Sequence, residues 1–233
     1  MVDRTAMDYV IPPSPRPTLP VAGSDLLFPV RRVYCIGRNY AEHAREMGHD
    51  PVREPPFFFQ KSPENLIADG VFPFPAHSSD VQFEVEMAVF LKSGGVDIDA
   101  ARALDHVFGY GVALDMTRRD LQGEAKKLGR PWEVGKAFEH SAPCSPVWPA
   151  AQTGHPSAGE IWLDQNGTRR QTGDLQQMIW GVGEQIAVLS RYFKLGGGDV
   201  ILTGTPAGVG RVARGDELDA GVAGVGQLHV TVA

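Results

Sequence analysis

Val81-Gln-Phe-Glu-Val-Glu-Met-Ala-Val-Phe-Leu91 has the composition of a long β-strand, rich in β-branched and aromatic residues. Its two glutamates, Glu84 and Glu86, are two residues apart, and side chains with that spacing in a strand point to one face. The other face is filled by apolar side chains, Phe83, Val85 and Met87. Two unpaired carboxylates buried side by side need a cation, bulk water or a shared proton. An exposed edge strand would supply the water, but the apolar sequence on both sides favours burial.

Around this stretch, short apolar and β-branched runs bounded by turn residues predict further strands. They lie at residues 30–36, 57–60, 71–74, 107–114, 161–165, 168–172, 200–202 and 227–232. Asn166-Gly167 separates two of these runs, and this dipeptide supplies the positive φ angles of a type I′ turn. We therefore expect a β-hairpin centred on that dipeptide.

Helices are fewer than strands in this interpretation. Helix-compatible segments cover residues 40–47, 99–105, 118–128 and 174–193. Thr117 is expected to cap the third of them and Asp174 the fourth. Strands do not alternate regularly with helices of similar length, so the fold class is expected to be α+β: a β-rich roll with a few short helices, not a doubly wound parallel sheet.

The first 28 residues differ from the rest in their proline content. Ile11-Pro-Pro-Ser-Pro-Arg-Pro17 is followed by Leu19-Pro20, a density of proline that excludes a helix and favours extended backbone. We expect residues 1–28 to form an N-terminal arm that lies on a single domain at 29–233. With 233 residues and 42% hydrophobic content, the chain is long and apolar enough for a buried core.

The chain is acidic, which bears on its partners. A net charge of −6 and a pI near 5.6 argue against a nucleic-acid surface, so small molecules are the expected partners. The two cysteines, Cys35 and Cys144, lack the spacing of a zinc site and fit a reducing cytoplasm. No signal segment is recognisable, and no run approaches the roughly 20 apolar residues that span a bilayer. We therefore expect a cytoplasmic protein without a membrane segment.

Asp115 is the third carboxylate of interest. It ends the apolar run 107–114, in which Tyr110 is the one ionisable residue, at the step into a predicted helix. It could be a helix cap and no more. If it instead joins Glu84 and Glu86, the three form an all-oxygen site that suits Mg²⁺ or Mn²⁺ and leaves positions open for water and a chelating substrate.

His43 and Glu46 are three residues apart, one turn along the predicted helix at 40–47. A carboxylate at that spacing can orient an imidazole and raise its basicity. Such a pair is more often found on a surface, so by itself it predicts little.

Further polar residues lie in apolar or glycine-rich surroundings. Arg119 and Gln122 share one face of the helix predicted at 118–128, and Lys136 could be either a site residue or a surface lysine. The run Leu202-Thr-Gly-Thr-Pro-Ala-Gly-Val-Gly210 lacks the Lys-Ser/Thr of a phosphate-binding P-loop. A tight turn there would expose backbone N–H groups and the Thr205 hydroxyl, which can bind a carboxylate as well as a phosphate.

Taken in order, these pieces resemble the fumarylacetoacetate hydrolase family. The matching fragments are Gly37-Arg-Asn-Tyr40 with His43 and Glu46, Phe83-Glu-Val-Glu86, Asp115-Met-Thr-Arg-Arg-Asp120 with Gln122, Gly135-Lys136 and Leu202–Gly210. Each fragment is weak alone, but five in the family's order are highly specific, and they cover the chain from about residue 30 to its end. The chain is similar to the short members of the family, close to acylpyruvases and fumarylpyruvate hydrolases.

This resemblance implies a mixed β-sandwich roll that forms homodimers. It implies Mg²⁺ or Mn²⁺ held by Glu84, Glu86 and Asp115, and water activated by His43 and Glu46. It also implies contacts with substrate for a further set of residues, Arg38, Lys61, Arg119, Gln122, Lys136, Gly204 and Thr205.

The reaction expected on this basis is hydrolytic carbon–carbon cleavage of a 2,4-dioxo acid, an acylpyruvate such as fumarylpyruvate, to fumarate and pyruvate. His43, oriented by Glu46, would activate water to attack the 4-carbonyl, and Lys136 with the metal would stabilise the departing pyruvate enolate. Decarboxylation of oxaloacetate, or isomerisation of an oxo-dioate, uses the same enolate and stays open. A binding protein without activity would lack a ligand or base, yet every expected position is filled. Four arginines could meet a carboxylate at the far end of the acyl group, Arg31, Arg32, Arg38 and Arg53.

Overall fold

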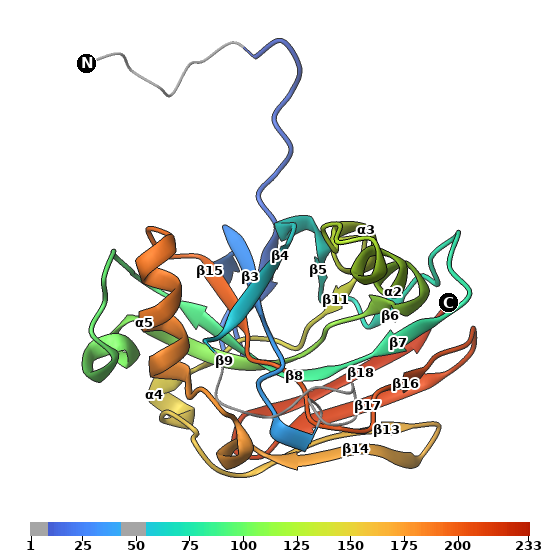
Figure 1. Cartoon of the computed structure of the whole chain (residues 1–233). Helices are drawn as coiled ribbons and strands as arrows, with labels where there is room; N and C mark the ends of the chain where they lie inside the picture. The colour runs from blue at the N-terminus through green and yellow to red at the C-terminus, as the bar shows by residue number, and fades with distance from the viewer. Residues whose placement is uncertain (1–8, 43–54) are drawn as a thin grey trace.

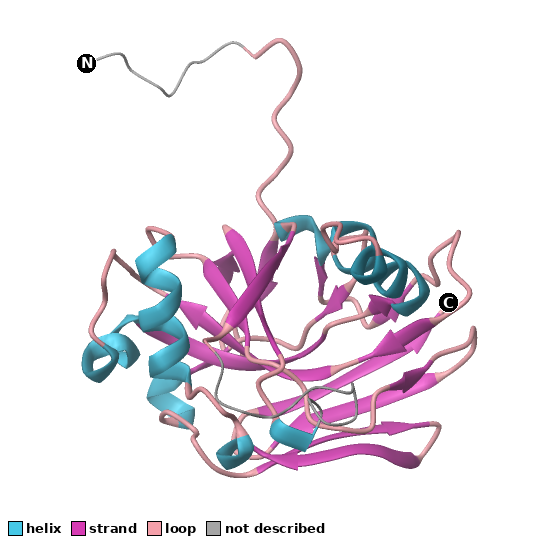
Figure 2. Ribbon diagram, in the orientation of Figure 1, coloured by secondary structure: helices cyan, strands magenta, loops and turns pink. Residues whose placement is uncertain are grey.

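The computed structural model of the chain describes residues 9–42 and 55–233. Strands dominate, and the helices lie at the margins of the sheets (Figures 1 and 2). This arrangement confirms the expected α+β, β-rich class. Most of the helix predicted at 40–47 lies outside the described residues. Among the residues described, no helix is both long enough and apolar enough to cross a membrane.

The larger of two main sheets has six strands and supports the core. In spatial order they are β12 (Trp148–Pro149), β9 (Val107–Leu114), β8 (Val85–Leu91), β15 (Asp199–Leu202), β3 (Arg32–Gly37) and β4 (Phe57–Lys61). Only β15 and β3 run parallel, and the other neighbours are antiparallel. Strand β8 is central and buried along its whole length, because apolar layers cover both faces of the sheet.

The second main sheet has five strands and carries the predicted hairpin. Its order is β14 (Thr168–Asp174), β13 (Glu160–Gln165), β17 (Glu217–Val222), β18 (Gly226–Val232) and β6 (Val71–Phe72). Asn166 and Gly167 join β13 to β14 with φ angles of 52° and 75°, as a type I′ turn requires. The hairpin is therefore confirmed.

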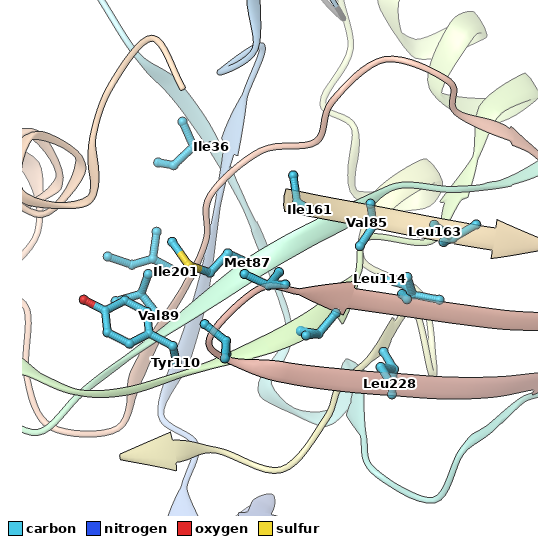
Figure 3. Close-up of a cluster of buried hydrophobic side chains, with 14 of the residues drawn as sticks. Ile36, Val85, Met87, Val89, Tyr110, Leu114, Ile161, Leu163, Ile201 and Leu228 are labelled. Atoms are coloured by element: carbon cyan, nitrogen blue, oxygen red, sulfur yellow. The ribbon is translucent and has the colours of Figure 1, made fainter. Parts of the chain in front are cut away.

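The main core lies between the two sheets. Figure 3 shows β8 and β9 side chains such as Val85, Met87 and Leu114 facing Ile161 and Leu163 of β13. A second apolar cluster covers the opposite face of the six-stranded sheet. It includes Leu19 of β1 (Thr18–Pro20) and Phe28 of β2 (Leu27–Pro29), two strands that pair with each other. A second short pair there joins β5 (Leu66–Ile67) to β11 (Ala142–Pro143).

The segment 81–91 forms two strands instead of the single one predicted. β7 (Val81–Phe83) belongs to a small sheet with β10 (Thr117–Arg118) and β16 (Gly210–Arg211), whereas β8 belongs to the six-stranded sheet. Residue 84 lies at the step between them, and residue 115 lies at the matching step between β9 and β10. The Asp115 N–H donates to the Glu84 carbonyl at 2.8 Å. The segment β7–β8 and the segment β9–β10 therefore stay in register across both steps.

Two helix predictions are corrected in detail. Helix α2 (Arg119–Lys127) follows strand β10, so Thr117 is not its cap; the Thr117 hydroxyl donates to the Asp115 carbonyl instead. The helix predicted at 174–193 is divided into a 3₁₀ turn, η4 (Leu175–Gln177), which Asp174 caps, and α5 (Val182–Tyr192). The remaining helical segments are η2 (Pro63–Asn65), η3 (Ala100–His106), α3 (Glu133–Lys136) and α4 (Ala150–Thr153).

Asn39 explains the interruption before α5. Its amide donates to the carbonyls of Trp180 and Thr203 at 3.0 and 2.8 Å, and its side-chain oxygen accepts from the Trp180 N–H at 2.8 Å. These long-range bonds satisfy backbone groups that a continuous helix would have paired internally. The contact also ties the end of β3 to the loop that follows β15.

Candidate metal centre and active site

Glu84, Glu86 and Asp115 form one buried cluster. One carboxylate oxygen of each lies within 4.8 Å of the others, and the residues are 5%, 2% and 1% exposed. The strand alternation brings Glu84 and Glu86 to one face, as predicted, and the register places Asp115 opposite Glu84. Because β8 is an interior strand, the alternative of a solvated edge strand is excluded.

Three cations surround this cluster. Lys136 Nζ donates to Glu84 Oε2 at 2.8 Å and to Asp115 Oδ2 at 2.7 Å. Lys61 Nζ lies 2.9 Å from Asp115 Oδ1, and Arg119 pairs with Glu84 Oε1. These cations allow carboxylates to be buried in the folded chain at all. Lys136 is therefore a site residue and not a surface lysine.

Lys136 stays charged in this environment. Burial disfavours its ammonium form, but the negative charges of Asp115 and Glu84 outweigh burial, so its pKa is raised. The Thr117 hydroxyl accepts a third hydrogen bond from Nζ at 2.7 Å. All three N–H donors of the ammonium group therefore have partners, which are Glu84, Asp115 and Thr117.

Glu86 is the carboxylate that no described residue neutralises through an ion pair. Its Oε2 accepts a hydrogen bond from the Gly204 N–H at 2.7 Å. Burial raises the pKa of Glu86 well above its usual range, and the charges of Asp115 and Glu84 raise it further. A bound cation would offset this electrostatic cost.

The donor set fits a hard divalent cation. Asp115 Oδ1 is buried, and among the described residues it meets only the Lys61 ammonium group, at 2.9 Å, so a second lone pair stays available beside Glu84 and Glu86. The cluster offers only carboxylate oxygens, the ligands that Mg²⁺ and Mn²⁺ prefer. The predicted cofactor therefore agrees with the geometry.

The three carboxylates and Lys136 form the floor of a pocket. This pocket brings most of the predicted site residues together. Its wall includes four of them, Arg38, Arg119, Gln122 and Thr205. Arg119 Nη1 donates to Gln122 Oε1 at 2.9 Å, which confirms that the two share a helix face. His43, Glu46 and Arg53 lie outside the described residues, so their predicted roles remain predictions.

Other predicted residues lie elsewhere. Lys61 does not line the pocket; its ammonium group lies behind Asp115, where it also contacts Ser141 Oγ at 3.0 Å and the carbonyls of Met116 and Lys136. Arg31 pairs with Asp199 at 3.1 Å, and Arg32 donates to the Tyr34 hydroxyl. Of the four candidate arginines, Arg38 is the one described residue that lines the pocket.

Several pocket residues were not predicted from the sequence. Phe57, Phe59, Lys126 and Trp132 all line the wall. The alternation of strand β4 would have placed Phe57 and Phe59 on one face, but nothing in the sequence indicated that this face meets the carboxylates. Gln171 was missed as well: its amide donates to Thr205 Oγ1 at 2.8 Å and accepts from the Val85 N–H at 2.9 Å, and no sequence signal distinguishes it.

Gly204→Ala is expected to weaken Mn²⁺ binding and to lower the free energy of unfolding by roughly 1–3 kcal/mol. Gly204 has a φ of +96°, and an added Cβ would lie 2.7 Å from Asn39 Cβ. The resulting shift would displace the N–H that holds Glu86. Calorimetric titration with Mn²⁺ and chemical unfolding measure the two effects.

Gly215→Ala is the matched control for this substitution. Gly215 has a φ of +88°, but an added Cβ would have no neighbour within 4 Å, so it shares the backbone strain without the clash. If both variants lose equal stability and bind Mn²⁺ equally well, the close approach of Gly204 to Asn39 does not position the metal ligand.

Known proteins resemble this chain over most of its length. The family profile for the fumarylacetoacetate (FAA) hydrolase C-terminal domain matches residues 32–233. A crystal structure of fumarylpyruvate hydrolase from Pseudomonas aeruginosa, in complex with Mn²⁺ and pyruvate, is 46% identical with a TM-score of 0.94, and the match covers 97% of this chain and 99% of that one.

Two further relatives are named for a different activity. Oxaloacetate tautomerase FAHD1, mitochondrial, from Rattus norvegicus is 39% identical over 202 residues, which is 87% of this chain and 91% of the relative. Oxaloacetate tautomerase YcgM from Escherichia coli is 43% identical over 199 residues, which is 84% of this chain and 90% of the relative. With its profile match, its fold and its acidic cluster in agreement, the chain belongs to the fumarylacetoacetate hydrolase family of metal-dependent enzymes.

Proposed function

We propose that the chain, as a homodimer, hydrolyses a small 2,4-dioxo acid, with fumarylpyruvate as the preferred substrate and fumarate and pyruvate as products. The composition of the pocket floor is the observation that supports this proposal. Three buried carboxylates lie there beside a lysine that remains an ammonium ion. Likeness to the Pseudomonas aeruginosa fumarylpyruvate hydrolase over nearly the whole chain supports the choice of substrate.

The described residues bind and orient the substrate in this proposal. When bound, the divalent cation supplies Lewis acidity to the 2-oxo acid end of the substrate. Arg119 is held by Glu84, by Gln122 and by Gln82 Oε1 at 2.9 Å, so its guanidinium is fixed at the pocket wall. Thr205, whose hydroxyl accepts a hydrogen bond from the Gln171 amide, lines the same pocket. Groups fixed in this way orient a reactant without losing further entropy.

Proton and charge movements follow from these positions. Water loses a proton to His43, for which Glu46 is the partner, and attacks the 4-carbonyl; this assignment rests on the family resemblance. The C3–C4 bond then breaks, and its electron pair goes to the pyruvate enolate. The Lys136 ammonium group stabilises that negative charge until C3 is protonated.

A second candidate function is the interconversion of the keto and enol forms of oxaloacetate, or its decarboxylation. The observation that favours the interconversion is the likeness to the oxaloacetate tautomerases of Rattus norvegicus and Escherichia coli. Both reactions pass through an enolate of a 2-oxo acid, which the same floor of carboxylates and Lys136 would stabilise. Neither needs water to attack a 4-carbonyl.

One assay separates these candidates. Purified protein with Mn²⁺ is incubated with fumarylpyruvate, acetylpyruvate or oxaloacetate, while the enol absorbance and the release of pyruvate are followed together. We expect the fumarylpyruvate absorbance to disappear with an equal amount of pyruvate formed, and EDTA to stop the reaction.

Other outcomes of this assay would contradict the proposal. Pyruvate released from oxaloacetate alone would assign the protein as a decarboxylase. Rapid decay of enol-oxaloacetate, with no pyruvate from any substrate, would assign it as a tautomerase.

A further inference from the structure

We propose that Arg38 and Lys126 form a subsite for a second carboxylate at the far end of the substrate, and that Phe57, Phe59 and Trp132 hold the unsaturated chain between this subsite and the carboxylate cluster. The substrate class is then a dianionic 2,4-dioxo acid with a conjugated acyl chain. This inference rests on the proposed function and narrows it.

The aromatic residues connect the floor of the pocket to the two cations. Lys136 Nζ lies 5.1 Å from the centroid of the Phe59 ring, and the Phe59 and Trp132 rings are 5.8 Å apart. Trp132 also meets Phe57 edge-on at 5.4 Å. All of these side chains line the same pocket as the carboxylate cluster. A flat, conjugated acyl chain packs well against such a wall.

The two cations are placed at this wall. Lys126 Nζ lies 4.9 Å from the Trp132 ring centroid, and the Arg38 guanidinium lies 5.2 Å from the Phe57 ring centroid. Because Phe57 and Trp132 touch, the two positive charges lie on neighbouring parts of one aromatic surface. Neither has an ion pair with any described residue, whereas Arg119 and Lys136 pair with the carboxylates of the floor.

The backbone at Arg38 costs free energy. Its φ is 57°, in the left-handed region that a residue with a Cβ adopts at a cost of roughly 1–2 kcal/mol. The adjacent Asn39 holds this turn through its bonds to Trp180 and Thr203. Strain kept at a pocket residue is typical of a functional position.

The electrostatics of Lys126 favour an anion beside it. Burial lowers the pKa of Lys126, and the positive charges of Arg119 and Arg38 lower it further. Like charges held close together in a partly buried pocket are destabilising in the absence of a counter-ion. A ligand carboxylate between Lys126 and Arg38 would relieve this repulsion, and a neutral methyl group would not.

Lys126→Met and Arg38→Met test the subsite with two probes that differ at the far end. Fumarylpyruvate carries a carboxylate there and acetylpyruvate carries a methyl group. In the Mn²⁺-loaded enzyme, we expect each substitution to lower the ratio of kcat/KM for fumarylpyruvate to that for acetylpyruvate by about tenfold or more. Lys127→Met is the matched control, because Lys127 is the next residue of α2, is exposed and lies outside the pocket lining.

The outcomes separate this inference from the proposed function. If the wild type releases pyruvate from both dioxo acids and the ratio is unchanged in both variants, the subsite is wrong while the hydrolysis stands. If the wild type releases pyruvate from neither, the proposed hydrolysis is wrong. The relative affinities of the two dioxo acids, measured by competition against oxalate, then decide the subsite: an equal ratio in wild type and variants overturns it.

Discussion

Replacing Asp115 with asparagine is expected to abolish measurable Mn²⁺ binding and to lower turnover by at least about 1000-fold, since a metal Lewis acid contributes several kcal/mol to catalysis. The substitution removes one of the three carboxylates of the buried cluster. It also places an amide N–H₂ where Lys61 and Lys136 now meet negative charge. Both changes act against a cation.

Thermal unfolding with and without Mn²⁺ gives a measurement that does not depend on activity. A ligand that binds only the folded state raises the melting temperature, so the wild type should gain stability from Mn²⁺ and Asp115→Asn should not. Asp105→Asn is the control, because Asp105 is exposed and pairs only with Arg102 among the described residues. A rise in Asp115→Asn equal to that of the wild type would show that Asp115 is not a metal ligand.

Lys61→Met is expected to lower the free energy of unfolding by about 3–5 kcal/mol in the absence of metal, as for other broken buried ion pairs. Its ammonium group is fully buried, with an ion pair to Asp115 at 2.9 Å and hydrogen bonds to Ser141 and two backbone carbonyls. Methionine fills a similar volume but cannot donate a hydrogen bond to any of these oxygens or offset the charge of Asp115. Chemical unfolding in EDTA measures the loss.

Mn²⁺ should restore part of the stability that Lys61→Met loses. The substitution removes one positive charge from the surroundings of three carboxylates, so a divalent cation is expected to bind the folded variant more tightly than the wild type. Lys92→Met, at an exposed lysine, should change neither quantity. A loss for Lys61→Met that matches the Lys92 control would refute the structural role, and an equal loss in EDTA and in Mn²⁺ would refute the electrostatic one.

Local chemistry made part of the site predictable. A separation of two positions along a strand places Glu84 and Glu86 on one face, and a separation of three positions along a helix places Arg119 beside Gln122. The turn at Asn166-Gly167 was predictable as well. Backbone φ angles and side-chain alternation both depend on only a few neighbouring residues.

The contacts that the sequence did not predict are long-range. The aromatic wall joins Phe57 to Trp132, and Lys61 reaches Asp115 from another strand. The helix predicted across 174–193 is interrupted before α5 because Asn39, far away in the sequence, takes the backbone groups of Trp180. Local propensity carries no information about a partner supplied by a distant segment.

The sequence by itself determined that this protein carries two carboxylates on one face of a buried strand, with a third at the end of another apolar run. The family resemblance implied that the third joins them, and only the tertiary structure decided how, through the shared register of the strands on either side of residues 84 and 115. It also decided that Lys136 and Arg119 neutralise the floor while Arg38 and Lys126 stay at the wall. The physical reason is that charges interact through space, so their balance depends on which distant segments the packing of two sheets brings together.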